Sequence, residues 1–268
     1  MAKIIAVANQ KGGVGKTTTA VNLVAALGAS GAKALLVDLD PQGNATVGSG
    51  IPSRQLKHTV KDVLLGERLV KDVVVSTEWS YDILPGNGEL TVAEVRLLER
   101  PAREQSLKQA LEPLMDTYQY IIIDCPPSLN MLTLNAMVAA DSVLVPIQCE
   151  YYALEGLTSL LGTIEQIKAS ANPNLHIEGL VRTMFDGRNR LARDVSDQLT
   201  QHFADKVYQT TIPRNVRVAE SPSHGAPVVA YDPQSLGGLA YLALGAELMR
   251  RQSTAKRSRK SKKEKAVA

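Results

Sequence analysis

Lys11-Gly12-Gly13-Val14-Gly15-Lys16-Thr17-Thr18 lies between an apolar run, residues 4–8, and a helical pattern rich in Ala, Val and Leu, residues 16–29. Glycines let the backbone curl so that successive N–H groups point at phosphate oxygens, and the N-terminus of the following helix adds partial positive charge. A strand, a glycine loop and a helix in this order predict a phosphate-binding P-loop. The other interpretation is a glycine turn with two solvated lysines, which the flanking strand and helix disfavour.

Each residue of this loop is expected to make a particular contact with a nucleoside triphosphate. Lys16 is expected to bridge the β- and γ-phosphates, and the Thr17 hydroxyl to bind Mg²⁺. Thr18 is expected to donate to the α-phosphate. Backbone contacts with the phosphates are expected from Gly12, Gly13, Val14 and Gly15.

The rest of the chain alternates short β-branched runs with helical patterns. Strands are expected at residues 4–8, 34–38, 120–124, 142–147 and 177–183, and helices at residues 16–29, 106–116, 134–140, 154–171 and 192–203. Near-continuous apolar strands indicate a parallel sheet covered on both faces. The expected fold is therefore α/β, a doubly wound, mostly parallel sheet in a three-layer α/β/α arrangement. Residues 73–84 are expected to add a strand or a hairpin at an edge.

Length and charge divide the chain into two unequal parts. With 268 residues and 44% hydrophobic content, residues 1–250 are expected to form one domain. From Arg250 onward there are nine Lys or Arg and one Glu, a net +8 that leaves −5 for residues 1–249. After a last amphipathic helix, residues 234–251, the segment 251–268 is expected to be a basic disordered tail. Any DNA affinity of the domain must come from a local patch, because its net charge repels a polyanion.

Acidic residues end two of the expected strands. Asp38 and Asp40 close the second strand in Val37-Asp38-Leu39-Asp40-Pro41-Gln42-Gly43-Asn44, and Asp124 closes the run before Cys125-Pro126-Pro127. Ligands of open α/β folds bind at the carboxyl ends of strands. Asp124 is expected to hold Mg²⁺ through a water. Aspartates after a strand often only cap the next helix, but the P-loop favours a role at the nucleotide.

Several ordered motifs together carry a family resemblance. The loop has Gln10 where an ordinary P-loop has its first glycine, and it adds an early lysine, Lys11. The segments at residues 38–46, 148–156 and 212–217 follow in order. Over residues 2–249 the chain resembles the ParA/Soj proteins, ATPases of the deviant Walker A class of P-loop NTPases (SIMIBI class).

The resemblance implies roles for individual residues of this sequence. Lys11 would reach across a dimer interface to the partner's nucleotide, and Asp40 would orient the attacking water. Asp38 would support the structure or the Mg²⁺ shell. Pro213 and Asn215 would line the adenine pocket. The implied catalytic residues are Lys11, Lys16 and Asp40, and the implied Mg²⁺ site is Thr17, Asp40 and Asp124.

The resemblance also implies partners. An ATP-bound homodimer would bind double-stranded DNA without sequence preference, through Arg188 and Arg217, extended by Arg190 and Arg214. A ParB/Spo0J-type protein would stimulate slow ATP hydrolysis, in the cytoplasm and on the nucleoid. The first strand is expected within the opening residues, with no preceding helix-turn-helix domain. Recognition of a DNA operator is therefore not expected, and DNA binding should be independent of sequence and strongly salt-dependent.

Three alternatives share the loop. A MinD-like membrane ATPase needs an amphipathic membrane helix, and residues 256–265 contain no Leu, Ile, Phe or Trp, so no stable membrane association is expected. An iron-protein relative needs interface cysteines, which Cys125 and Cys149 do not match, and Cys125 is expected to be a packing residue. A ParA-like ATPase that positions a cargo other than a chromosome or plasmid would have the same motifs, so the sequence does not distinguish it from a segregation ATPase.

Overall fold

Eight strands form one sheet in the order β3-β4-β2-β5-β1-β6-β7-β8. The structure is a computed structural model that describes the backbone of residues 1–267 and their side chains except those of Arg54 and residues 255–267. All neighbouring strands are parallel except β3 and β4, which pair antiparallel. The strands are β1 (Lys3–Val7), β2 (Ala34–Asp38), β3 (Val75–Ser76), β4 (Asp82–Leu84), β5 (Tyr120–Asp124), β6 (Ser142–Gln148), β7 (His176–Phe185) and β8 (Val207–Pro213).

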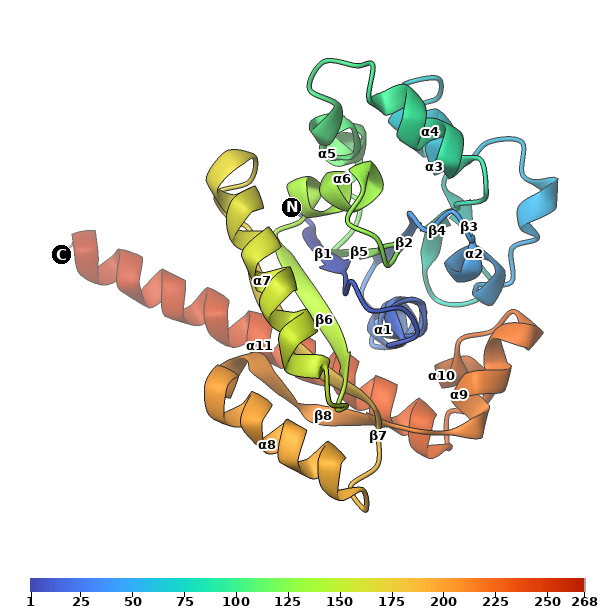
Figure 1. Cartoon of the computed structure of the whole chain (residues 1–268). Helices are drawn as coiled ribbons and strands as arrows, with labels where there is room; N and C mark the ends of the chain where they lie inside the picture. Colours follow the sequence, from blue (N-terminus) through green and yellow to red (C-terminus); the bar gives the residue numbers. More distant parts are fainter. Residues whose placement is uncertain (268) are drawn as a thin grey trace.

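Helices cover both faces of this sheet (Figure 1). One core contains side chains of α3 to α8, and the other contains side chains of α1, α10 and α11. The helices are α1 (Lys16–Ala29), α2 (Asn44–Gly48), α3 (Val60–Leu64), α4 (Leu90–Leu97), α5 (Ser106–Leu111), α6 (Met131–Ala139), α7 (Ala153–Ser170), α8 (Arg190–Phe203), α9 (Val216–Glu220), α10 (Val228–Tyr231) and α11 (Leu236–Val267). The expected three-layer, doubly wound α/β fold is confirmed.

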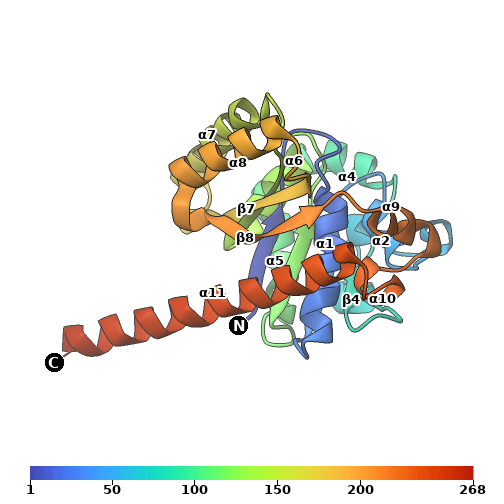
Figure 2. The same cartoon turned by 90° about the horizontal axis from the view of Figure 1, so that it is seen from below.

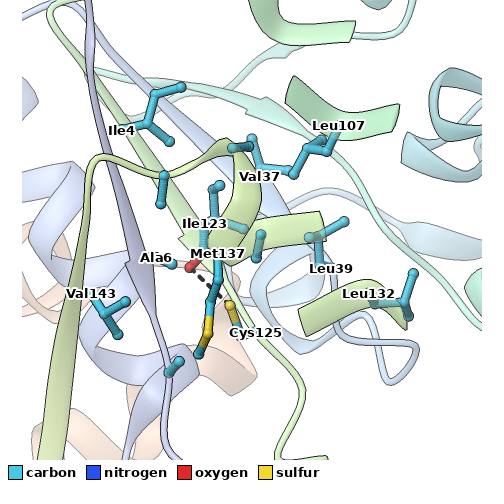
Figure 3. Close-up of a cluster of buried hydrophobic side chains, with 14 of the residues drawn as sticks. Ile4, Ala6, Val37, Leu39, Leu107, Ile123, Cys125, Leu132, Met137 and Val143 are labelled. Carbon is cyan, nitrogen blue, oxygen red and sulfur yellow. Dashed lines mark hydrogen bonds between the residues drawn. The ribbon is translucent and has the colours of Figure 1, made fainter. Parts of the chain in front are cut away.

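Strand β1 illustrates why the central strands are apolar throughout. Successive side chains of a strand point to opposite faces of a sheet. Ile4 and Ala6 belong to one core, whereas Ile5 and Val7 belong to the other. Figure 3 shows Ile4 and Ala6 grouped with side chains of β2, β5 and α6. A strand that is buried on both faces has no side facing solvent, so its sequence does not alternate between apolar and polar residues.

Strand β8 and helix α4 are among the elements that were not expected from the sequence. Strand β8 is an edge strand in which exposed and buried residues mix, so it carries no continuous apolar run. Helix α4 has only three buried residues, Leu90, Ala93 and Leu97. Residues 73–84, in contrast, contain the expected edge hairpin, β3 and β4.

Helix α11 runs past the boundary that the sequence predicts after residue 250. Its first half is buried through Tyr241, Leu244 and Leu248. The Arg251 guanidinium then donates to Glu247 Oε1 at 2.7 Å and to the Val207 carbonyl at 2.8 Å. Arg251 is therefore tied to the folded body, because the buried Glu247 carboxylate needs a cation. The separation of a disordered tail stays a prediction for the residues that follow.

Candidate active site

The expected site residues lie together at one edge of the sheet. The glycine loop follows β1, while Asp38 and Asp124 are the last residues of β2 and β5. Strand β5 lies between β2 and β1, with Asp124 in register with both Asp38 and Val7. Because all three strands are parallel, their carboxyl ends meet at one edge, and the loop and both carboxylates share it.

The loop presents unpaired backbone N–H groups. Gly13 and Gly15 have φ angles of 74° and 84°, in the left-handed region that favours glycine. Within residues 1–267, none of the N–H groups of residues 12–18 has a hydrogen-bond acceptor, and the first that has one is Thr19, bonded to the Gly15 carbonyl at 2.9 Å. A Cβ added at Gly12 or Gly13 would meet nothing within 4 Å. A helix N-terminus with unpaired donors and open space before it fits an anion such as a phosphate chain.

Lys16 is a buried cation beside this loop. Its ammonium donates to the Lys11 carbonyl at 3.2 Å. Burial lowers the pKa of Lys16, while attraction to Asp124 and Asp40 opposes that shift. The ammonium therefore lies within the electrostatic reach of both carboxylates, next to the free N–H groups.

Asp124 is a buried carboxylate whose charge is only partly offset, by Lys16 and Thr17. Its side chain is 0% exposed, and among the backbone and side-chain groups that the structure describes neither carboxylate oxygen has a hydrogen-bond partner. Burial, together with repulsion from Asp38, raises the pKa of Asp124 well above its ordinary value. An unpartnered carboxylate is costly unless a cation or a bound water satisfies it. The position of Asp124 at the strand end therefore suits a carboxylate that accepts a hydrogen bond from a water molecule on Mg²⁺.

The two aspartates of the β2 edge have different surroundings. Asp38 Oδ2 accepts from the Thr46 amide at 2.8 Å and from the Thr46 hydroxyl at 2.7 Å, and Oδ1 accepts from the Asp40 amide at 3.2 Å. Burial raises the pKa of Asp38 to about 6 despite these bonds. Asp40 accepts one bond, from the Gln42 amide at 3.0 Å. Asp38 therefore holds the loop in place, the first of the two roles considered for it, and Asp40 keeps acceptor capacity near Lys16.

Replacing Asp38 with alanine should destabilise the fold much more than replacing Asp40. The Asp38→Ala change leaves two buried donors of Thr46 unpaired, and we expect a loss of about 2 kcal/mol, since burial of the charge already offsets part of the bonding. Asp40→Ala removes one bond and should cost less than about 1 kcal/mol. The midpoint of urea unfolding measures both, and equal shifts would contradict the division of roles.

Lys11 does not lie in the loop's anion site. Its ammonium forms an ion pair with Glu150 at 2.5 Å, and both side chains are largely exposed. Glu150 follows the end of β6, and the Asn9 side chain accepts from the Lys11 amide at 3.0 Å. The early lysine is therefore held at the rim of the site by a surface ion pair, a contact worth about 1 kcal/mol or less.

Pro213 and Asn215 lie at the same edge, at the end of β8 and just after it. Pro213 is the last residue of β8 and pairs with Phe185 of β7. The Asn215 side chain caps α9 by accepting from the Val218 amide at 3.3 Å. This contact is the structural role that an Asn in a loop often has, so the adenine pocket stays a prediction.

Cys125 packs in the core. Its side chain is buried among Ile123, Leu132 and Met137, as Figure 3 shows, and burial raises the pKa of its thiol. A thiol held protonated in this way is a poor nucleophile. Cys149 is also buried, and both cysteines are free.

The four arginines expected to bind DNA form two neighbouring groups. Arg188 and Arg190 follow β7, while Arg214 and Arg217 follow β8, and all four are exposed. Arg188 pairs with Asp186 at 2.8 Å, and Arg217 pairs with Glu220 at 2.5 Å and with Asp232 at 3.2 Å. The groups share the carboxyl edge, but carboxylates of the same chain neutralise part of their charge.

Two residues that hold the site together were not assigned from the sequence. Thr46 binds Asp38, and Glu150 binds Lys11. Both lie inside motifs that carry the family resemblance, at residues 38–46 and 148–156, and this is the only signal that could have found them. Their partners are 8 and 139 positions away along the chain, which no local pattern encodes.

Known proteins match this arrangement over nearly the whole chain. A family model described as an AAA domain matches residues 2–177. The chromosome partitioning protein ParA of Caulobacter vibrioides is 51% identical over 253 residues, which cover 93% of this chain and 95% of that protein. The sporulation initiation inhibitor protein Soj of Bacillus subtilis is 51% identical over 249 residues, which cover 92% of this chain and 98% of that protein. The chain belongs to the ParA/Soj family.

A solved structure that contains a bound nucleotide also matches this chain. Cobyrinic acid a,c-diamide synthase from Mycobacterium smegmatis, with a bound ATP analogue and magnesium, has a TM-score of 0.84 and 38% identity to this ParA/Soj chain. The match covers 95% of this chain and 97% of that one. Together with the unpaired loop donors and the orphaned Asp124 carboxylate, these findings identify the chain as an ATPase that uses ATP and Mg²⁺. Within residues 1–267, no helix has the length and apolar character needed to cross a membrane.

Proposed function

We propose that this ATPase is a nucleotide-gated switch that binds DNA during chromosome or plasmid segregation. The proposal is supported by the position of the second lysine, Lys11. Lys16 already supplies the buried cation of the site, whereas Lys11 is held at the rim by an exposed ion pair. Since an exposed pair is weak, a phosphate chain on another subunit competes easily with Glu150 for Lys11.

In the proposed cycle two ATP-bound subunits pair, and each Lys11 leaves its own Glu150 for the partner's nucleotide. Thr17, Asp40 and Asp124 would hold Mg²⁺, which neutralises charge on the phosphates. Asp40 orients the attacking water, and Lys16 stabilises charge that develops on the phosphates. Pro213 and Asn215 would line the adenine pocket.

Pairing would also assemble the DNA-binding surface. Arg188 and Arg190 follow the end of β7, and Arg214 and Arg217 follow the end of the neighbouring strand β8, so two subunits would present four such groups. On DNA, phosphates replace the chain's own carboxylates around these guanidinium groups. ATP hydrolysis ends the DNA-bound state, and a ParB/Spo0J-type protein accelerates this hydrolysis. This cycle places the protein in the cytoplasm and on the nucleoid.

The test is DNA co-sedimentation at moderate salt with ATP, with ADP and without nucleotide. We expect binding to be strongest with ATP, and Arg217→Glu to weaken it at least about tenfold because repulsion replaces attraction. Arg96→Glu is the matched control, since Arg96 is also 52% exposed and paired with a glutamate, but lies on α4. Equal loss in both variants, or equal binding in all nucleotide states, would contradict the proposal.

A further inference from the structure

Helix α11 leaves the body of the molecule at the edge opposite the nucleotide site. It begins near the carboxyl edge and runs back along the sheet, so that Arg251 reaches the carbonyl of Val207, the first residue of β8. Gln252 donates to Glu178, near the start of β7, at 2.7 Å. Figures 1 and 2 show the helix continuing beyond the body after these contacts.

The segment that follows Thr254 in the sequence, residues 255–268, is here named the basic extension. It has seven Lys or Arg and one Glu, a net charge of +6 that leaves −3 for residues 1–254. Its only apolar residues are three alanines and one valine. The positive charge of the chain is thus concentrated in a segment whose sequence contains no large apolar residue.

We propose that the basic extension is a second contact with duplex DNA, which binds phosphates without sequence preference and does not depend on nucleotide. A net charge of +6 on a short segment matches a polyanion that carries one charge per about 1.7 Å of its axis. The anchor of the extension is built from Arg251, Glu247 and Gln252, none of which lies in the nucleotide site. The bonds of this anchor go to the starts of β7 and β8, at the end of the sheet opposite the loop, so we expect the extension to bind DNA equally with and without ATP.

The extension is separate from the arginine surface of the proposed function. Arg214 and Arg217 follow the end of β8, whereas Arg251 is anchored at its start. The seven residues of β8 separate these points by about 23 Å along the strand. The two contacts therefore reach different phosphates, and the inference goes beyond the ATP-gated switch.

A membrane surface fits the extension less well than DNA does. A helix that lies in a bilayer interface buries an apolar face of Leu, Phe or Trp, and the extension has none of these residues. What remains is electrostatic attraction, which is strongest for the polyanion of highest charge density.

The experiment measures binding of a duplex of arbitrary sequence by fluorescence anisotropy, without nucleotide, between about 50 and 200 mM salt. It compares the full chain with a chain ending at Thr254 and with a full-length chain in which residues 255–268 are scrambled. The shortened chain keeps Arg251 and Gln252, so it should fold normally by circular dichroism. We expect it to bind at least about tenfold more weakly at low salt, with a salt slope smaller by about 4 to 5. The scrambled chain should bind like the original.

Equal affinity of the full and shortened chains would overturn the inference, as would a loss of binding on scrambling. Vesicles of phosphatidylglycerol are the competing surface, and capture by vesicles without DNA binding would also overturn it. The ATP-dependent increment is measured in the same chains and should survive shortening but not Arg217→Glu. Failure of the inference and failure of the proposed function are therefore distinguishable.

Discussion

Lys16→Ala should abolish ATP binding. Lys16 is the buried ammonium beside the unpaired N–H groups of the loop, and the negative charge of Asp124 and Asp40 remains when it is removed. A phosphate chain would then approach two carboxylates without the compensating cation. We expect affinity for ATP to fall at least about 100-fold, corresponding to about 3 kcal/mol of lost charge-assisted bonding. Isothermal titration calorimetry with Mg²⁺ and ATP measures the loss.

Lys11→Ala is the matched control for this result. Lys11 is exposed and bound to Glu150, outside the anion site, so its removal should leave ATP affinity of the monomer within about threefold of the original. Dimer formation in ATP, followed by light scattering, should be lost instead. A Lys16→Ala protein that bound ATP normally would refute the assignment of the site, and a Lys11→Ala protein that paired and hydrolysed ATP normally would refute the proposed cycle.

Asp40→Ala should nearly stop ATP hydrolysis while ATP binding persists. Asp40 makes one hydrogen bond, to the Gln42 amide, and lies within reach of the Lys16 charge. Loss of a group that orients or activates water lowers turnover by about 10²- to 10⁴-fold. The variant should therefore accumulate on DNA in the presence of ATP, as followed by phosphate release and by co-sedimentation.

Asp40→Asn separates the chemical role of this side chain from its structural one. An asparagine keeps an acceptor for the Gln42 amide but has no carboxylate charge. We expect hydrolysis to fall as far as in Asp40→Ala, with unfolding midpoints unchanged. Full activity of the asparagine variant would show that only the bond to Gln42 matters.

Much of the fold follows from the central strands. The apolar runs that became β1, β2, β5 and β6 were predicted within about a residue, and helix α1 over residues 16–29. These strands are buried on both faces, so their composition is independent of register and readable locally. Edge strand β8 and helix α4 were missed because a half-exposed element mixes polar and apolar residues in the way that loops do.

By itself the sequence determined the phosphate site, since a glycine loop between a strand and a helix imposes its donors through local geometry. It also placed Asp38, Asp40 and Asp124 at strand ends. Only the tertiary structure decided which of these carboxylates is bonded and which is orphaned, and that Glu150 holds Lys11. Hydrogen bonds, burial and ion pairs join residues far apart along the chain, so their energies depend on packing that no local pattern contains.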